Sequence, residues 1–368
     1  MPTSLSETCE LANHRLVSQQ LIRSPVGSPQ GVVRWMGAMQ AQDYAMAKWA
    51  IGIRLPGSTD ALIEQAINDG DIIRTHLLRP TWHFVAADDV RWMLQLTAPH
   101  VNRIAGTQYR QLELDDAVFA RTNALIARML AGGQHRTRDQ IMIALQADGI
   151  ESNPLRAAHI LLRAELDQVV CNGARRGKQL TYALFDERVP AGWPFHRQEA
   201  AVKLTQRYFT SHGPATVPDF AWWSGLPLRE IRASLDALKS VLTQETIGRH
   251  TYWFSSEQVA LTNGAGSSIE NLVHVLPAFD EFLIGYADRS ACLPAYLAQR
   301  VILANGIFKP SIAIGGQLAG TWKRTVRKNT VELQMQLLTG RSLPEAALQA
   351  GIERYGAFMA LTPQIHWL

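Results

Sequence analysis

The feature that most constrains the fold is a pattern of segments that occurs three times along the 368 residues. Each copy predicts three helices followed by two short β-rich segments, and the turn between these two segments is basic or contains glycine. A hairpin that follows a cluster of three helices is typical of a winged helix. The sequence therefore predicts a mainly α protein with β-structure (α+β), built from winged helices in tandem.

The second copy is the clearest of the three. Apolar residues at helical spacing predict a helix over 117–130. Thr137 is suited to cap a second helix, and the pair Asn153-Pro154 to begin a third. The segments 169–171 and 180–184 then predict a hairpin. The tip of this wing carries Arg175, Arg176 and Lys178.

The third copy covers about 197–254. It predicts helices over 200–209 and 217–223 and a third helix opened by Pro227. The segments 242–247 and 251–254 are expected to pair across a turn that contains glycine.

The first copy is less regular. It predicts helices over 11–23, 32–39 and 60–67. The segments 72–78 and 81–86 form its wing, and the turn between them includes Arg79.

Beyond Ser268 the pattern changes from helical to β-rich. The segments 273–276, 312–314, 317–322 and 331–337 read as strands, and 343–360 reads as a terminal helix. Gly315-Gly316 is a strong signal for a two-residue hairpin turn, and 264–268 reads as a linker. The expected domains are 1–110, 111–192, 193–262 and 263–368.

Composition limits the class of protein. The net charge is +4 and the pI is about 9.0, which permits a polyanionic partner. Cys9, Cys171 and Cys292 are far apart and indicate reduced thiols. With no signal peptide and no membrane-spanning segment in the sequence, we expect a cytoplasmic protein. Winged helices also dock proteins, but three in tandem favour nucleic-acid binding.

Common catalytic motifs are missing from the sequence. It has no phosphate-binding loop, no dinucleotide fingerprint, no zinc-protease motif and no serine-hydrolase elbow. His76 and His83, on the two strands of the first wing, lack a third metal ligand, so ordinary hydrogen bonds are the favoured interpretation. His83 is kept as a candidate DNA contact. We expect no metal and no cofactor.

Two further clusters have alternative interpretations. Asp280, Glu281 and Asp288 could bind a metal, but a structural network of ion pairs and caps is favoured. The run 322–328 holds four cations, and its Lys323 and Arg324 are candidate phosphate contacts or simply part of a solvated face.

The tripeptide Gln40-Ala41-Gln42 has two interpretations. The two amides could decorate the end of the helix predicted over 32–39. Alternatively, they could act on a water molecule, because an amide both accepts and donates hydrogen bonds. Two amides suffice to orient one water when the leaving group is already activated.

Four segments of the chain resemble the AlkZ/YcaQ-like winged-helix DNA glycosylase family, which joins three tandem winged helices to a β-barrel. The resemblance covers nearly the whole chain, and the longer segments are the specific ones. They are Gly37-Ala38-Met39-Gln40-Ala41-Gln42-Asp43, Arg74 through Val85, Leu276 through Arg289, and Gly315-Gly316 through Gly320-Thr321-Trp322.

The resemblance implies a C-shaped molecule with a C-terminal β-barrel-like domain. It also implies a monofunctional glycosylase that repairs alkylation damage in double-stranded DNA by releasing N7-alkylated purines. Gln40 and Gln42 would position the water, as in the branch with two glutamines, whose members unhook interstrand crosslinks. Gly315-Gly316 would probe the minor groove. No membrane and no obligate protein partner are implied.

Two alternatives to this activity stay open at the level of sequence. One is a non-catalytic winged-helix DNA-binding or regulatory protein. The other is a metal-dependent nuclease built on Asp280, Glu281 and Asp288.

Overall fold

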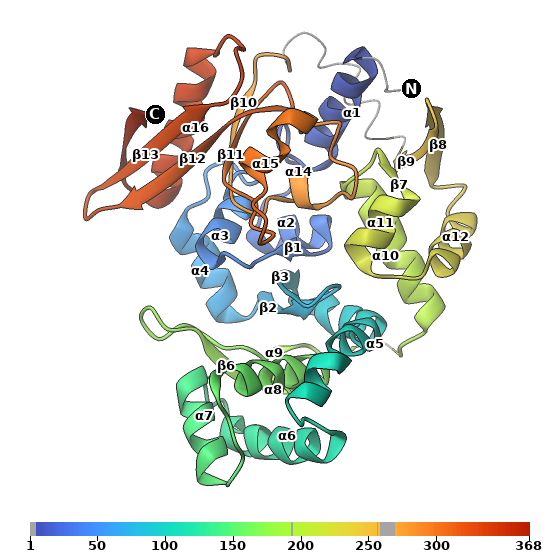
Figure 1. Cartoon of the computed structure of the whole chain (residues 1–368), viewed down its shortest axis with the longest axis vertical. Helices are drawn as coiled ribbons and strands as arrows, with labels where there is room; N and C mark the ends of the chain where they lie inside the picture. Colours follow the sequence, from blue (N-terminus) through green and yellow to red (C-terminus); the bar gives the residue numbers. More distant parts are fainter. Residues whose placement is uncertain (1–4, 193, 256, 258–268) are drawn as a thin grey trace. The chain divides into compact units, whose positions relative to one another are not determined.

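A computed structural model describes residues 5–192, 194–255, 257 and 269–368 (Figure 1). It mixes helices and strands, as predicted. The chain forms two compact units, one from Met1–Glu64 with Ala201–Leu368 and the other from Gln65–Ala200. The division into four domains stays a prediction, and the linker expected at 264–268 lies outside the described residues.

The predicted succession of three helices and a wing is present in all three stretches, and a short strand is added after the first helix of each. The bounds are α2 (Pro29–Met36), β1 (Met39–Gln40), α3 (Tyr44–Gly52), α4 (Asp60–Asp69), β2 (Ile72–Leu77) and β3 (Thr81–Ala86); α6 (Asp116–Leu130), β4 (Arg136–Thr137), α7 (Arg138–Ala147), α8 (Pro154–Leu166), β5 (Val170–Asn172) and β6 (Thr181–Leu184); and α10 (Arg197–Ser211), β7 (Ala215–Thr216), α11 (Val217–Ser224), α12 (Leu228–Ala237), β8 (Leu242–Ile247) and β9 (His250–Ser255).

Helix caps explain why these helices begin where they do. Thr137 and Gln140 form a reciprocal capping box at the start of α7, and the side chain of Asn153 caps α8 ahead of Pro154. Thr216 begins α11 in the same way as Thr137 begins α7. The short strand before α7 or α11 then completes a three-stranded sheet, in the orders β4-β6-β5 and β7-β9-β8.

The second unit is held together by buried polar groups beneath the first wing. The Glu165 carboxylate accepts from the backbone N–H of His76 at 2.8 Å and lies 2.7 Å from its ring Nδ1. Asn172 Oδ1 accepts from the N–H of Arg74 at 2.7 Å. The long helix α5 (Ala87–Gln111) packs against β2, β3 and α8. These contacts attach the first wing to the second winged helix.

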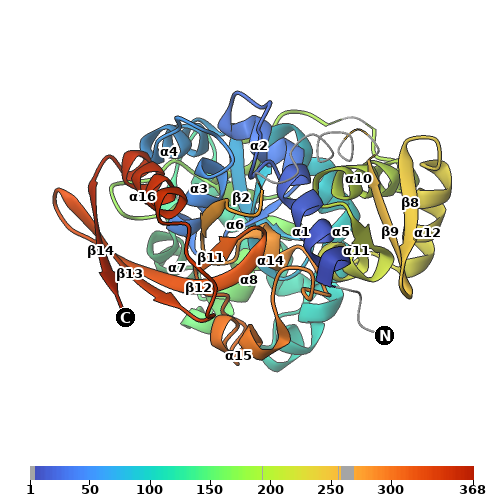
Figure 2. The ribbon, with the colours of Figure 1, turned by 90° about the horizontal axis from the view of Figure 1, so that it is seen from above.

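The C-terminal part of the first unit is a five-stranded sheet with the order β10-β11-β12-β13-β14. Neighbouring strands are antiparallel except for β13 and β14, which are parallel because α16 crosses over between them. Figure 2 shows α16 on one side of the sheet, where it packs against β10, β14 and α3. The bounds are β10 (Val273–Leu276), β11 (Ser311–Ile314), β12 (Gln317–Val326), β13 (Thr330–Leu337), α16 (Glu345–Met359) and β14 (Thr362–Trp367).

The predicted Gly315-Gly316 turn is present between β11 and β12. Both glycines have positive φ, at 55° and 73°, which suits a two-residue hairpin turn. A Cβ at Gly316 would lie 3.0 Å from the Cβ of Ala12 in α1 (Leu5–Ser18), and one at Gly315 would lie 2.8 Å from the carbonyl oxygen of Glu270. This turn therefore packs against the protein, which favours a structural role; its minor-groove contact stays a prediction.

Several boundaries differ from those expected. Helix α1 ends at Ser18 rather than at 23, in a turn where Gln20 adopts a φ of 58°. Helix α2 ends at Met36 because Gly37 takes a φ of 80°, so the Gln pair lies beyond the helix. The unpredicted elements include the long helix α5 and the edge strand β14, whose Pro363 is atypical of strands.

The buried His274 on β10 makes stability depend on pH. Burial lowers the pKa of His274 to about 4, although its hydrogen bond with the Leu21 carbonyl opposes the shift. The unfolded chain, with an ordinary pKa, takes up this proton first, so stability is lost as the pH falls from about 6.5 to 4. The loss is about 3 kcal/mol at 1.36 kcal/mol per pKa unit. We expect urea denaturation of His274→Gln to depend less steeply on pH, whereas the exposed His366→Gln should follow the wild type. Parallel curves for His274→Gln and the wild type would contradict this assignment.

Candidate active site

The Gln40-Ala41-Gln42 segment connects a strand to a helix. Gln40 lies on β1 and is 5% exposed, whereas Gln42 is exposed and stands just before Asp43. Asp43 caps α3 by accepting from the N–H of Met46 at 3.0 Å. One amide is thus held within the protein and the other lies at its surface, at the beginning of a helix.

The segment leaves α2 through Gly37, where a positive φ and close neighbours disfavour a side chain. A Cβ at Gly37 would lie 3.2 Å from Cδ of Arg207 and 3.6 Å from the ring of Trp223, and the φ of 80° is unfavourable for other residues. Helices α10 and α11 of the third winged helix therefore pack directly against the backbone that leads to Gln40.

The Glu281 carboxylate fixes the backbone at Gln40. Its Oε1 accepts from the Gln40 N–H at 2.8 Å, and its Oε2 accepts from the indole N–H of Trp223 at 3.1 Å. Glu281 is 1% exposed and is the first residue of α14 (Glu281–Ile284). One carboxylate therefore ties the candidate catalytic segment to both the third winged helix and the C-terminal part of the chain.

The neighbouring Asp280 is held by a buried ion pair. Its two carboxylate oxygens each accept from Arg54 at 2.8 Å, and both side chains are 0% exposed. Asp280 also caps α14 through the N–H of Phe282. This is the structural network that the sequence analysis favoured over a metal site.

The remaining donors of Arg54 lead into the core of the first unit. Arg54 donates to the backbone and to the side chain of Gln19, and Gln19 donates to the Tyr286 hydroxyl and to the carbonyl of Glu281. Tyr286 in turn donates to the carbonyl of His212 at 2.7 Å. Burial raises the pKa of Tyr286 and lowers that of His212, so both groups stay neutral near pH 7.

The predicted DNA contacts of the second wing lie at an exposed tip. Arg176 and Gln179 exchange backbone hydrogen bonds around the tight turn at Gly177-Lys178. Arg176 and Lys178 are exposed, whereas Arg175 is half-buried and its N–H donates to Asn68. The tip therefore presents cations on a fixed hairpin.

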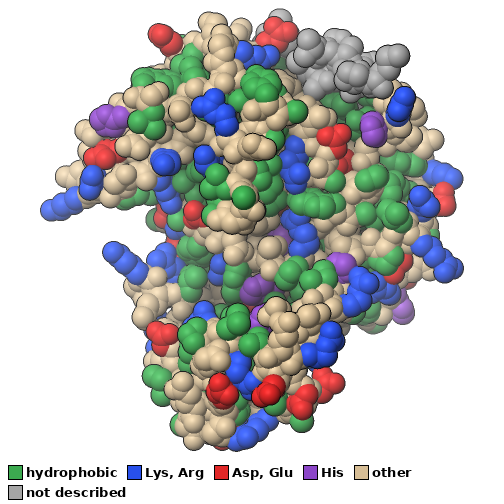
Figure 3. All heavy atoms as spheres, viewed as in Figure 1, with side chains coloured by type: hydrophobic (Ala, Val, Ile, Leu, Met, Phe, Trp, Pro, Cys, Tyr) green, Lys and Arg blue, Asp and Glu red, His purple; other side chains and the backbone are tan. Residues whose placement is uncertain are grey.

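The basic run 322–328 lies on the end of β12 and in the turn that follows it. Arg324 is held against α16 by the Tyr355 hydroxyl, and Arg327 pairs with Glu332 at 3.1 Å. Lys323 and Lys328 are exposed. Figure 3 shows Lys and Arg side chains gathered at the free end of the β12–β13 hairpin.

The two candidates on the first wing are less accessible. His83 is 0% exposed and its Nδ1 lies 2.9 Å from the carbonyl of Thr81. Arg79 is half-buried in the turn between β2 and β3. Their contact with DNA stays a prediction.

Neither a metal site nor a membrane span is found in the described part of the chain. Across 5–192, 194–255, 257 and 269–368, the His, Cys, Asp and Glu side chains form no group of three or more that could hold a metal ion. Within the same residues, every helix is too short or too polar to cross a bilayer.

Comparison with known proteins defines the class. The model of the AlkZ-like DNA glycosylase family matches residues 33–358, and the chain belongs to this family. It is 24% identical over 320 residues to the interstrand DNA cross-link repair glycosylase of Streptomyces sahachiroi, covering 80% of this chain and 82% of that protein. It is similar in fold to the solved structure of Streptomyces sahachiroi DNA glycosylase AlkZ, with a TM-score of 0.80, 20% identity and coverage of 98% and 99% of the two chains. The predicted family, fold class and enzyme class are thereby confirmed.

The contact between Glu281 and Gln40 could not be predicted from the sequence. The two residues are 241 positions apart, and no local pattern signals a contact over that separation. The only local sign was the position of Glu281, which follows Asp280 within an otherwise apolar segment and so could be a buried acceptor.

We expect Glu281→Gln to destabilise the protein. The Gln amide has a single oxygen, so its NH2 group would face one of the two N–H donors of Gln40 and Trp223. Leaving a buried donor unsatisfied costs about 1–3 kcal/mol. Urea denaturation would show this loss, whereas Glu353→Gln, on the exposed face of α16, should change stability by less than about 0.5 kcal/mol. Equal midpoints for Glu281→Gln and the wild type would mean that the carboxylate does not hold this segment.

Proposed function

We propose that this chain hydrolyses the N-glycosidic bond of N7-alkylated purines in double-stranded DNA, with Gln40 and Gln42 orienting the attacking water. Membership of the AlkZ-like family over 33–358 supports the reaction class. The observation that carries the assignment of residues is the anchored segment itself. Its backbone is fixed at Gln40 by a buried carboxylate, and its second amide is exposed to an incoming substrate.

The chemistry requires little from the protein beyond positioning. Alkylation at N7 gives the purine a positive charge, which weakens the bond to C1′ and removes the need for a general acid. What remains is to place a water molecule beside C1′ while positive charge develops on the sugar. Amide oxygens can accept from this water and turn its lone pair toward C1′.

Crosslinked DNA is the second part of the proposal. The curated relative from Streptomyces sahachiroi is named for repair of interstrand crosslinks. We infer that this chain accepts N7-linked crosslinks as well as simple adducts, because an exposed Gln42 lets the bulky adduct remain outside the protein. The exposed cations of the wing tip, Arg176 and Lys178, would contact the DNA backbone.

The direct test is release of free base from a duplex that carries one N7-methylguanine, measured in the presence of EDTA. Base release independent of the chelator supports a glycosylase. Binding without base release would favour a regulatory winged-helix protein, and EDTA-sensitive strand cleavage would favour a metal-dependent nuclease.

We expect Gln40→Ala and Gln42→Ala each to lower the single-turnover rate by about 10²-fold or more while DNA affinity stays nearly intact. The reason is that an oriented water contributes to the transition state rather than to binding. Gln42→Ala is the decisive variant, since an exposed side chain can be removed without unfolding the protein. Gln349→Ala, on the exposed face of α16, is the control. Wild-type rates in the double variant would remove both residues from the mechanism.

The wing-tip cations give a separate prediction in binding. For Arg176→Ala/Lys178→Ala we expect the slope of log K against log salt to fall by about 0.9 for each DNA phosphate that the wing no longer neutralises. Affinity should weaken equally for damaged and undamaged duplexes, because phosphates carry no information about the base. Arg110→Ala/Arg128→Ala, which removes two exposed helical cations from the same unit, serves as a charge-matched control. An unchanged slope in the wing variant would make the tip a solvated surface.

A further inference from the structure

The third helices of the three winged-helix copies differ in the charges that they could offer to DNA. Helix α4 of the first copy contains no lysine or arginine and carries three carboxylates, Asp60, Glu64 and Asp69. Helix α12 of the third copy carries Arg229 and Arg232. In helix-turn-helix proteins the recognition helix enters the major groove of the duplex. The charges therefore favour the third copy over the first as a reader of DNA.

The cations of α8, the third helix of the second copy, are already engaged within the protein. Arg163 forms an ion pair with Asp167 at 2.8 Å, and Arg156 donates to the carbonyls of Glu151 and Leu112. The helix also packs against α5 and β2. Its basic side chains therefore serve the packing of the second unit.

Helix α12 presents one exposed face. Arg229, Arg232 and Ala233 lie on it at helical spacing, whereas Ile231 and Leu235 are buried on the opposite side. The helix has 10 residues and packs on α11. The major groove of B-DNA is about 12 Å wide and admits an α-helix. The small side chain of Ala233, in the middle of the exposed face, lets the helix approach the bases closely.

The two arginines of α12 form no ion pair, hydrogen bond or ring contact with any residue that the structure describes. The acidic residues of the same helix are engaged elsewhere. Asp236 pairs with Lys239 at 2.7 Å, and Glu230 is half-buried and has an interaction of its own. The guanidinium groups can therefore donate to phosphate oxygens or to guanine without first breaking a contact within the protein.

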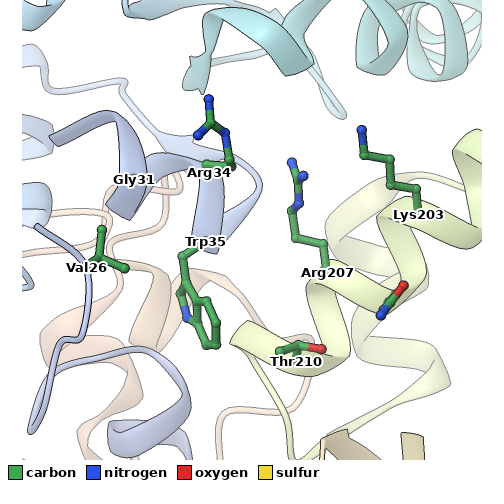
Figure 4. Close-up of a pocket in the computed structure, with 8 residues that line it drawn as sticks. Val26, Gly31, Arg34, Trp35, Lys203, Arg207 and Thr210 are labelled. Carbon is green, nitrogen blue, oxygen red and sulfur yellow. The ribbon is translucent and has the colours of Figure 1, made fainter. Parts of the chain in front are cut away.

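The cations of α10, the first helix of the same copy, differ in this respect. Figure 4 shows Lys203 and Arg207 of α10 and Arg34 of α2 around a pocket of about 450 Å³. Each of these three side chains already has an interaction within the protein, so their charge does not indicate a ligand.

The wing of the third copy adds a cation at its tip. Strands β8 and β9 pair up to Ile247 and His250, so that Gly248 and Arg249 form the turn. Arg249 is exposed and has no partner within the described part of the chain. A helix with free arginines beside a wing with a basic tip suits contact with duplex DNA.

Contacts within the first unit connect α12 to the candidate active site. Helix α12 packs on α11, and Trp223 of α11 donates to the Glu281 carboxylate that also accepts from the Gln40 N–H. A duplex held by α12 therefore has a fixed relation to the segment proposed to orient the water.

We propose that α12 and the wing tip at Arg249 form a second DNA-binding surface, which holds the duplex to one side of the damaged nucleotide. Helix α12 lies in the major groove, where Arg229 and Arg232 donate to base edges or phosphates, and Arg249 contacts the backbone. The inference rests on the proposed function for its substrate, but the contact is measured by DNA affinity without base release.

The test is a series of duplexes that extend from one N7-methylguanine by about one to four helical turns of about 10 bp on each side. With the wild type, affinity should rise once the flanking duplex reaches α12. Arg229→Gln/Arg232→Gln should lose this rise and bind the longest duplex roughly tenfold more weakly than the wild type, with equal affinity for the shortest. Both side chains are exposed, so the fold should be retained.

Arg110→Gln/Arg128→Gln removes two exposed helical arginines of the second unit and is the control. It should keep the wild-type rise of affinity with length. A wild-type affinity independent of length would overturn the proposal, as would a rise of wild-type size in the α12 variant or an equal loss in the control.

Ala233→Trp tests whether α12 enters the groove. The substitution adds bulk to an exposed position and leaves the charge unchanged, so it should weaken binding to the longest duplex if this face approaches the DNA closely. Ala350→Trp, at an exposed position of α16, should bind like the wild type. Undiminished affinity in Ala233→Trp would overturn the groove contact.

The two proposals fail in different ways. If the wild type releases no base, the glycosylase assignment for this substrate fails, but the dependence of affinity on duplex length still measures the contact with α12. If base is released and that dependence is absent, the α12 proposal alone fails.

Discussion

The buried carboxylates Asp280 and Glu281 are the interaction on which the first unit depends. Taking charges out of water is costly, and the cost is offset here because Arg54 meets Asp280 with two parallel hydrogen bonds while Glu281 accepts from two N–H donors. Removing one member of such a network leaves a buried charge or donor uncompensated. The network therefore fixes the position of the strand that carries Gln40, because the Gln40 N–H must reach the Glu281 carboxylate.

The same network supports the precision that the proposed site of two amides requires. An amide side chain is flexible and uncharged, so it orients a water molecule only if its own backbone is fixed. Gln40 obtains this from Glu281, and the helix that follows begins at the Asp43 cap. Arg207 and Trp223 also pack against Gly37, three residues before Gln40. The buried hydrogen bonds of Asp280 and Glu281 therefore lie next to the uncharged amides of the proposed site.

Much of the architecture could be predicted from local signals. Caps such as Thr137 and Asn153, and glycine turns such as Gly315-Gly316, are encoded within a few residues, so helix starts and hairpins were placed well. The errors have physical causes. Nothing in the sequence between 11 and 23 signals that Gln20 leaves the helical region, and an edge strand containing Pro363 does not look like a strand.

The candidate site was predictable only in part, because local signals in the sequence do not reveal contacts between distant residues. A motif makes Gln40 and Gln42 candidates, but the carboxylate that fixes the backbone of Gln40 comes from a distant position in the sequence. Arg54 and Asp280 stand 226 residues apart. At about 5–20 residues per second, a ribosome needs more than ten seconds to connect them. Until then Arg54 lacks its buried counterion and the Gln40 N–H lacks its acceptor, so the strand that carries Gln40 cannot be fixed in place before residues 280 and 281 have been synthesised.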